Sequence, residues 1–261
     1  MTEILQSHRY GRVLRLTLNR PEKRNALSAE LCRELVRAIE EAERDPAVGA
    51  ILLAANGKAF CAGMDLSELG VVATPEIDRA QEQLFTLGAR VTKPVVAAIA
   101  GPALGGGTGL AVNCHIVIAS EGATFGLTEI RLGLWPFLVF RAVTAALGER
   151  RAVELSLTGR IFGAREAREM GLVHEVAADA PARAAEVAEA LAGRSPTAIR
   201  GGMAFVGEVR GMDWAAAGAI ARRVRNEAFE SRDFQEGLRA FREKRPPRWP
   251  SLESPNEGLG E

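Results

Sequence analysis

Three consecutive glycines, Gly105 to Gly107, are the first feature of this sequence that indicates chemistry. They follow a short apolar run, Val95 to Ala100, which has the length and composition of a buried strand. The apolar segment after them fits one or two turns of helix. Glycines before a helix start indicate backbone amides that are approached too closely to tolerate a side chain. The first amides of a helix lack intrahelical partners and carry the positive end of the helix dipole, so they can stabilise a developing negative charge.

A lone carboxyl group, that of Glu129, follows in an otherwise apolar stretch. Its apolar neighbours in the sequence are Phe125, Leu127, Ile130, Leu132, Leu134 and Trp135. A polarising amide on one side of a carbonyl group and a carboxyl group on the other can move a proton at the adjacent carbon. We expect burial to raise the pKa of Glu129, so that it both gives and takes protons near neutral pH. From the residues alone, an ordinary carboxylate at a strand end explains Glu129 equally well.

A second loop, Ala62-Gly63-Met64, also has small residues before an expected helix, so it can present a backbone N–H without a hydrogen-bond partner. Two such amides that converge on one carbonyl oxygen form an oxyanion hole, in which each donor contributes ~3 kcal/mol in the transition state. Each loop taken separately is explained as well by a tight turn made for packing.

Strands and helices are mixed up to about residue 178, and only helices are expected from Pro181 to Phe241, which predicts an α/β protein. The expected strands cover residues 13–18, 50–54, 95–100 and 172–176. The expected helices cover residues 29–45, 77–91, 139–147, 149–158 and 164–170. Ser28 is the expected N-cap of the first helix, and Gly171 is expected to close the last one. The chain divides into a core with the active site, residues 1–195, and a helical region, residues 196–261.

Composition excludes several classes of protein. The 33 basic side chains equal the 33 acidic ones, so no nucleic-acid or membrane partner is expected. The three cysteines fit a reducing compartment, and no basic region followed by an apolar core opens the chain, so we expect a cytoplasmic protein. Residues 94–113 have the length of a membrane span, but their two prolines and five glycines favour a buried strand and helix.

The sequence motifs resemble those of the enoyl-CoA hydratase/isomerase (crotonase) family. The segments that carry the resemblance are FCAGMDL at 60–66, GPALGGGTGLA at 101–111 and FGLTEIRLGLWP at 125–136. Three further segments fit as well, namely NRPEKRNALS at 19–28, LTGRIFGAREAREMGLV at 157–173 and FREKRPP at 241–247. The resemblance covers nearly the whole chain, in the right order and with specific spacings.

The resemblance implies a spiral of ββα units, a helical C-terminal trimerisation region and a homotrimer or hexamer. It also implies an acyl-CoA thioester as substrate, with coenzyme A as part of that substrate and no prosthetic group. The family positions for the oxyanion amides match Met64 and Gly106, and the position of the main catalytic glutamate matches Glu129.

The resemblance further implies contacts with coenzyme A. Backbone groups around Ala62, Asp65 and Leu66 are expected to recognise the adenine end, with Lys23 and Arg24 near the phosphates. Two positions late in the chain match residues that reach the coenzyme A of a neighbouring subunit; they are Phe241 and Lys244.

Departures from the family pattern bear on the reaction. Hydratases of the two-glutamate type hold water between two carboxylates, and Gly109 stands where the second would be. Residues 135–140, Trp-Pro-Phe-Leu-Val-Phe, replace the usual Pro-Gly-rich segment and suggest a more apolar or differently shaped acyl pocket. His115 replaces a frequent aspartate. We expect hydration of a 2-enoyl-CoA first, because the segments at 163–173 and 243–247 resemble hydratases. A single-glutamate double-bond isomerase and a non-catalytic acyl-CoA binder are the alternatives.

Other sites are not supported by the sequence. His8, His115 and His174 are dispersed without ligand spacing, so no metal site is expected, and His115 is better explained as a hydrogen-bonded interior residue. The glycine run lacks the G-x-G-x-x-G spacing of a dinucleotide site, and no G-x-S-x-G nucleophile elbow is present.

Overall fold

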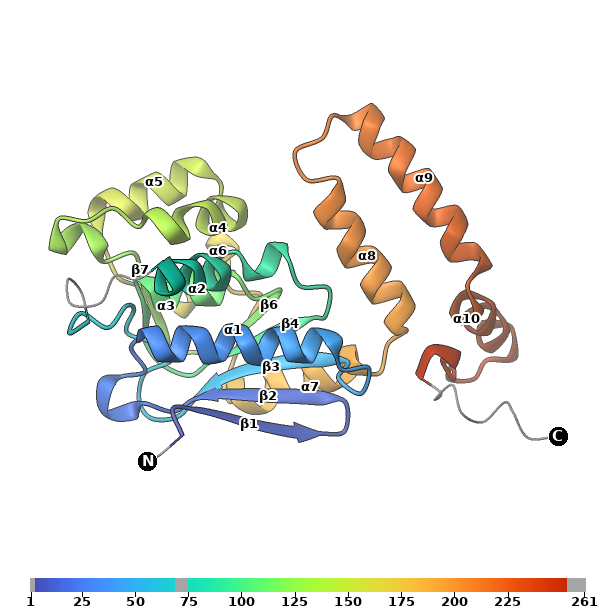
Figure 1. The fold of residues 1–261 in the computed structure, drawn as a ribbon, viewed down its shortest axis with the longest axis horizontal. Coiled ribbons are helices and arrows are strands. Elements are labelled where there is room, and N and C mark those ends of the chain that lie inside the picture. The colour runs from blue at the N-terminus through green and yellow to red at the C-terminus, as the bar shows by residue number, and fades with distance from the viewer. Residues whose placement is uncertain (1–2, 69–74, 253–261) are drawn as a thin grey trace.

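The computed structural model describes residues 3–68 and 75–252 and is built around a six-stranded sheet of order β1-β2-β3-β4-β6-β9 (Figure 1). The β1–β2 pair is antiparallel, and the pairs that follow in this order are parallel. The strands are β1 (Leu5–Tyr10), β2 (Val13–Leu18), β3 (Ala50–Ala55), β4 (Val95–Ile99), β6 (Ile116–Ser120) and β9 (Glu175–Ala177). Parallel neighbours need crossover connections, so each turn of the chain adds helix or loop beside the sheet.

A second, smaller sheet lies next to the first and joins three short strands in the order β5-β7-β8. They are β5 (Ala103–Leu104), β7 (Thr124–Gly126) and β8 (Phe162–Gly163). Strand β5 comes directly after β4 and just before the glycine run, and it pairs in parallel with β7. This pairing brings the glycine run close to the segment that carries Glu129.

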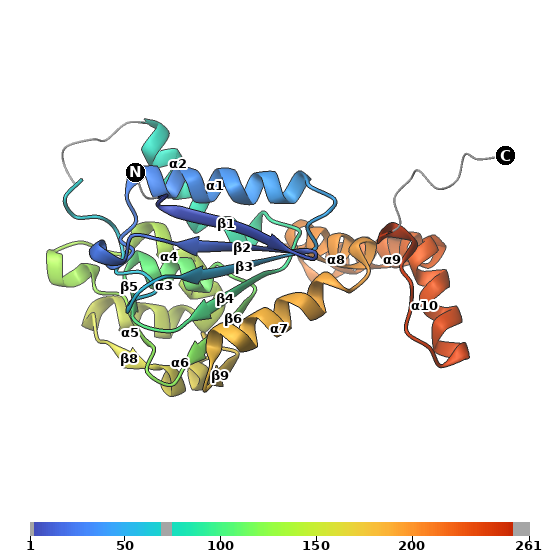
Figure 2. The same cartoon turned by 90° about the horizontal axis from the view of Figure 1, so that it is seen from below.

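Helices cover both faces of the large sheet (Figure 2). Helix α1 (Ala29–Arg44) packs on one face through apolar side chains spaced three or four residues apart. Helix α7 (Ala180–Ala192) packs on the other face through alanines at every fourth position, Ala180, Ala184, Ala188 and Ala192. Because alanine is small, α7 can lie close to strands β3, β4 and β6, which it contacts. The α/β fold class predicted from the sequence is confirmed.

The remaining helices of the core surround the small sheet and the glycine run. They are α2 (Pro75–Phe85), α3 (Gly106–Val112), α4 (Phe137–Leu147), α5 (Glu149–Thr158) and α6 (Ala164–Met170), with the 3-10 helices η1 (Pro21–Lys23), η2 (Leu87–Ala89) and η3 (Glu129–Leu132). Helix α3 packs on α4, and α2 contacts both of them.

Three helices at the C-terminal end project away from this core in both views (Figures 1 and 2). They are α8 (Pro196–Glu208), α9 (Trp214–Glu230) and α10 (Arg232–Glu243), followed by the 3-10 helix η4 (Pro250–Leu252). No residue of α8 or α9 is buried within the described part of the chain. The predicted division between residues 195 and 196 falls where α8 begins, and residues 253–261 lie outside the described residues.

Most predicted elements are confirmed with small shifts. Ser28 caps α1 by accepting a hydrogen bond from the Leu31 N–H at 3.2 Å, and Gly171 ends α6 with a φ of 93°. Strand β9 begins three residues later than predicted, because the N–H groups of Leu172 and Val173 donate to the Ala167 carbonyl at the end of α6.

Two further elements differ from the prediction. The strand β1 was not predicted from the sequence. The helix predicted for 77–91 ends at Phe85 and continues as the separate turn η2. Within the described residues, no helix is long and apolar enough to cross a membrane.

Candidate active site

Glu129 is the first residue of η3, three residues after β7 ends. Its carboxyl group lies against the glycine run, since a Cβ atom added to Gly105 would be 3.1 Å from Glu129 Oε1. The other oxygen, Oε2, is buried and has no hydrogen-bond partner among the described residues. Burial raises the pKa of Glu129 above its usual value, and a hydrogen bond from its own backbone N–H offsets part of that shift. The predicted direction of the shift agrees with this geometry.

The glycine run and Glu129 are held together by a short pairing of the backbone. Leu104 of β5 pairs with Gly126 of β7, and the Gly105 N–H donates to the Gly126 carbonyl at 2.7 Å. The buried hydroxyl of Thr108 donates to the Ala103 carbonyl at 2.6 Å and accepts from the Gly126 N–H at 3.1 Å. The first turn of α3 and the segment leading to Glu129 therefore form one hydrogen-bonded unit.

The second glycine loop, residues 61–65, lies between two other segments and is hydrogen-bonded to both. On one side, the Leu104 N–H donates to the Cys61 carbonyl at 2.9 Å. On the other side, Leu27 is hydrogen-bonded to both neighbours of Met64. Its N–H donates to the Gly63 carbonyl at 2.8 Å, and its carbonyl accepts from the Asp65 N–H at 3.0 Å. The loop is thus fixed on both edges like a strand.

The two loops touch at their glycines. Gly63 has a φ of 98°, which a residue with a side chain rarely adopts, and a Cβ there would lie 3.4 Å from the Gly106 nitrogen. Within residues 3–68 and 75–252, the N–H groups of Met64 and Gly106 donate no hydrogen bond. The structure therefore brings the Glu129 carboxyl and two N–H groups that have no partner among the described residues into one neighbourhood.

The space beside Gly109 is filled. A Cβ atom on Gly109 would lie 2.1 Å from Val139 Cγ1 of α4 and 3.2 Å from Phe85 Cε1 of α2. Phe85 also packs against Gly106, where an added Cβ would meet its Cζ at 3.3 Å. The position of the missing second carboxylate is therefore occupied by apolar side chains. Of the segment 135–140, Val139 packs against α3, whereas Phe137 and Leu138 are exposed.

The residues predicted to contact coenzyme A near this loop differ in exposure and in the hydrogen bonds of their backbone groups. Lys23 and Arg24 are exposed on the turn beside residues 61–65, and the Arg24 carbonyl accepts from the Ala62 N–H at 3.0 Å. The Asp65 side chain is buried, its N–H donates to the Leu27 carbonyl at 3.0 Å and its carbonyl accepts from the Glu68 N–H at 3.1 Å, so both backbone groups of Asp65 are used within the chain. Leu66 is exposed.

Phe241 and Lys244 lie at the C-terminal end of α10, which is far from α3 in both views (Figures 1 and 2). Phe241 is 81% exposed. The structure does not bring these two residues to Glu129 within one chain.

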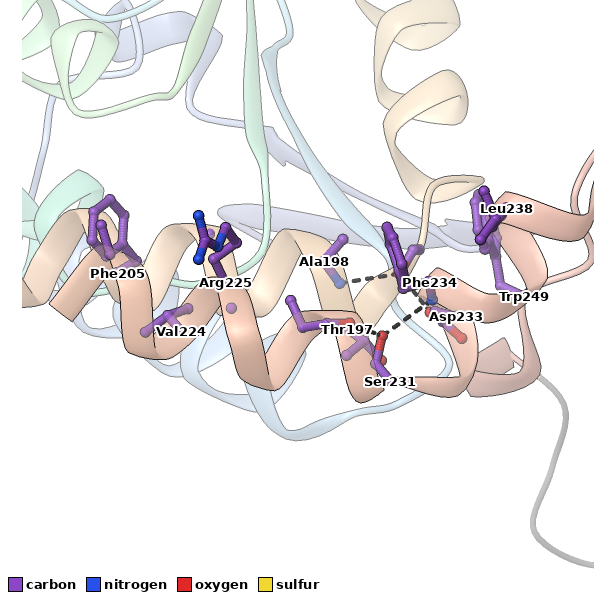
Figure 3. A pocket seen from close by; sticks show the side chains of 16 residues that line it. Thr197, Ala198, Phe205, Val224, Arg225, Ser231, Asp233, Phe234, Leu238 and Trp249 are labelled. Carbon is purple, nitrogen blue, oxygen red and sulfur yellow. Dashed lines mark hydrogen bonds between the residues drawn. The ribbon is translucent and has the colours of Figure 1, made fainter. Parts of the chain in front are cut away.

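A large apolar cavity also lies away from Glu129. It has a volume of about 650 Å³ and lies between α8, α9 and α10, where Phe205, Val224 and Phe234 line it (Figure 3). Asp233 closes one end by accepting hydrogen bonds from the hydroxyls of Ser195 and Ser251 at 2.5 and 2.6 Å. Since none of these residues is near the glycine loops, we assign this cavity to the projecting helices and not to catalysis.

Other potentially reactive groups are buried or partly buried. His115 Nδ1 accepts from the Val95 N–H at 3.0 Å, its Nε2 has no hydrogen-bond partner among the described residues, and burial lowers the pKa of His115. Cys32, Cys61 and Cys114 are free and buried, and burial raises the pKa of each thiol to about 12. The described residues contain no group of three or more potential metal ligands.

Three comparisons with known proteins identify the family and agree with this fold. The sequence model of the family "Enoyl-CoA hydratase/isomerase" matches residues 8–252. Enoyl-CoA hydratase EchA19 of Mycobacterium tuberculosis is 36% identical over 254 residues, 92% of this chain and 93% of that protein. Mevalonyl-coenzyme A hydratase sidH of Aspergillus fumigatus is 35% identical, and the match covers 91% of each chain. The crystal structure of an enoyl-CoA hydratase from Mycobacterium smegmatis has a TM-score of 0.89 at 30% identity and covers 95% of this chain and 99% of that one.

The chain therefore belongs to the enoyl-CoA hydratase/isomerase family and has the crotonase fold. It is an enzyme of a family that acts on acyl-CoA thioesters.

Sequence reasoning missed several residues that shape the site. Arg20 binds the buried Asp65 carboxylate. Asn25 donates from its side-chain amide to the Asn56 carbonyl. Thr108 joins α3 to β5 and β7. Arg20 and Asn25 lie within the motif NRPEKRN, but their roles depend on distant partners that the motif does not reveal.

Proposed function

We propose that this enzyme hydrates a 2-enoyl-CoA, with the N–H groups of Met64 and Gly106 as oxyanion donors and Glu129 as the acid and base. The observation that carries the proposal is the buried Glu129 carboxyl beside two N–H groups that have no partner in the described chain. The names of relatives, such as enoyl-CoA hydratase for the 36% identical protein of Mycobacterium tuberculosis, support hydration as the reaction.

In the proposed mechanism, the thioester oxygen accepts hydrogen bonds from both N–H groups. As charge moves onto this oxygen, the enolate is stabilised, and each donor contributes ~3 kcal/mol. Glu129 removes a proton from the water that adds to C3 and then delivers a proton to C2. A raised pKa suits both steps, because it makes the Glu129 carboxylate a stronger base and its protonated form easier to reach than in an ordinary glutamate.

The packing of Val139 against Gly109 favours a second candidate, the isomerisation of a 3-enoyl-CoA to a 2-enoyl-CoA. Moving a double bond requires one base that takes a proton from C2 and returns it to C4. Hydration by one carboxylate is more demanding, since the same group must activate water and protonate carbon.

Two assays test the proposal. Crotonyl-CoA and a 3-enoyl-CoA are offered side by side; isomerisation without hydration would exclude hydration as the reaction. Glu129→Gln is then expected to reduce kcat by about 100-fold or more while thioester binding is retained. An unchanged rate would remove Glu129 from its role in catalysis, whereas no turnover of either thioester by the wild type would favour the third alternative, a protein that binds acyl-CoA without catalysis.

We propose further that three chains assemble through α8, α9 and α10, and that Phe241 and Lys244 contact the coenzyme A of a neighbouring chain. Their distance from Glu129 in one chain, the exposure of Trp214 and the apolar cavity between these helices support this assembly. Lys23, Arg24 and the backbone around Ala62 are proposed to hold the remaining part of coenzyme A. Light scattering gives the mass of the particle; a monomer at micromolar concentration would contradict the proposal.

A further inference from the structure

Arg20 makes two hydrogen bonds beside the proposed oxyanion loop that the mechanism above does not use. Its guanidinium donates from Nη1 to the Ala26 carbonyl at 2.5 Å and from Nη2 to Asp65 Oδ2 at 2.9 Å. The Arg20 side chain is only 14% exposed and the Asp65 side chain 8%. A charged side chain this deeply buried calls for a structural or functional reason.

The bond to Ala26 begins a row of aligned peptide groups. The Ala26 carbonyl shares its peptide plane with the Leu27 N–H, which donates to the Gly63 carbonyl at 2.8 Å. The Gly63 carbonyl shares its plane with the Met64 N–H. In a trans peptide the C=O and N–H groups point in opposite directions, and the described residues contain no cis peptide. The row therefore runs from the guanidinium through two peptides and ends at the Met64 N–H.

Such a row affects the last donor in two ways. Each hydrogen bond polarises the next one, by about 10–30% per bond, and the charge-assisted guanidinium N–H at the start polarises the row in the direction that strengthens the final N–H. The row also fixes the direction of the Met64 N–H. Because the Gly63 carbonyl accepts from the Leu27 N–H, the Met64 N–H of the same peptide group points away from Leu27.

Asp65 anchors the guanidinium that starts the row. Its Oδ1 accepts from the Ser67 N–H at 3.1 Å and the Ser67 hydroxyl at 2.6 Å, and its own N–H donates to the Leu27 carbonyl. Arg20 therefore joins the segment before Leu27 and the segment after Met64, so neither can shift alone.

We propose that Arg20 is a positioning residue that orients and polarises the Met64 N–H through the peptide groups 26–27 and 63–64. The inference rests on the proposed function, in which the Met64 N–H binds the thioester oxygen. Arg20 itself touches no substrate in this role.

The test uses hexa-2,4-dienoyl-CoA, a conjugated thioester whose absorption moves to longer wavelength when its carbonyl oxygen is polarised. The variant is Arg20→Gln in the full chain. Its control is Lys93→Gln, because Lys93 is also a buried cation, and its ammonium group donates to the carbonyls of Ala42 and Asp45, away from the glycine loops.

We expect Arg20→Gln to lose most of the red shift of the bound dienoyl thioester and about 10-fold in kcat, while the dissociation constant of free coenzyme A changes by less than about 3-fold. Lys93→Gln should retain the full red shift and kcat even if its melting temperature falls. A wild-type red shift in Arg20→Gln overturns the role of Arg20. If the wild-type enzyme itself gives no red shift, the oxyanion hole of the proposed function fails instead.

A second variant keeps the test decisive if Arg20→Gln does not fold. Arg20→Lys keeps the charge but lacks the planar fork that reaches Ala26 and Asp65 together. We expect it to show a smaller red shift than the wild type with coenzyme A affinity retained. An unchanged red shift and kcat in Arg20→Lys would overturn the proposal.

Discussion

Val139 occupies the space that a side chain at position 109 would need. A Cβ atom on Gly109 would lie 2.1 Å from Val139 Cγ1 and 2.7 Å from Val139 Cβ, well inside van der Waals contact. A second carboxylate at this position is therefore excluded unless α4 moves away from α3. The single carboxyl group of the site follows from the packing of two helices and not from one residue alone.

Gly109→Ala should accordingly destabilise the protein by about 1–3 kcal/mol, because the core has no room for the added methyl group. Urea unfolding measures this change. Gly122→Ala is the control, because an added Cβ at Gly122 has open space, and its effect should stay within about 0.5 kcal/mol. The double variant Gly109→Ala/Val139→Ala should cost less than the sum of the single changes; strict additivity would contradict the contact.

The raised pKa of Glu129 predicts how stability depends on pH. The folded protein holds this proton more tightly than the unfolded chain, so the contribution of Glu129 to stability is fully present below its ordinary pKa of 4.5 and is lost as pH rises through the raised value. Replacing Glu129 by Gln removes that loss. We expect the stability advantage of Glu129→Gln over the wild type to grow from pH 4 to pH 8 in thermal melts.

Glu121 provides the control of opposite sign, because a hydrogen bond from Arg165 lowers the pKa of Glu121. Glu121→Gln should show no growing advantage as pH rises. In activity assays, kcat/KM of the wild type should rise with pH with a midpoint above 4.5; a midpoint at or below 4.5 would contradict the burial of Glu129.

Thr108 should matter for both folding and turnover. Thr108→Val removes the hydroxyl that bonds the Ala103 carbonyl and the Gly126 N–H, which costs about 0.5–1.5 kcal/mol per lost hydrogen bond. We also expect a lower kcat, since these bonds join α3 to the segment of Glu129. Thr108→Ser keeps the hydroxyl and is the matched control. Equal unfolding free energies for the Val and Ser variants would contradict this role.

Mixing two defective chains tests the proposed contact between subunits. If Glu129 of one chain and Phe241 of another serve the same site, Glu129→Gln and Phe241→Ala chains assembled together contain some sites with both native residues. Activity at low thioester concentration should then exceed the sum of the two separate preparations. Phe229→Ala replaces Phe241→Ala as the control, because Phe229 is also an exposed phenylalanine of the C-terminal helices but has no predicted contact with coenzyme A.

The sequence was most informative where local rules decide the structure. The N-cap Ser28 and the helix expected at 29–45 are both confirmed in α1, whose side chains Leu31, Leu35 and Ile39 are buried at helical spacing. The glycine motifs and Glu129 were recognised because their residue types and order are specific. Their proximity could not be predicted from spacing, since it depends on the β5–β7 pairing between segments about 20 residues apart.

Other features could not be predicted from the sequence, because they depend on contacts between residues that are far apart in the chain. Val139 looked like part of an acyl pocket, yet its contact with Gly109 follows from how α4 packs on α3. Arg20 carries no signal that distinguishes it from a surface arginine, because its partner Asp65 is 45 residues later. Strand β1 was missed because only one of its six residues, Leu5, is buried.

The short backbone pairing of β5 with β7 has a consequence for how such an enzyme can diversify. The amide of Gly106 and the carboxyl of Glu129 are positioned by the same few hydrogen bonds, whereas Phe241 and Lys244 both lie at the C-terminal end of α10, away from these strands. If Phe241 and Lys244 hold coenzyme A as proposed, substitutions in the outer helices can alter how tightly a thioester binds without changing the distance between Gly106 and Glu129. Under this proposal, binding affinity and proton transfer can evolve independently, because they depend on different parts of the molecule.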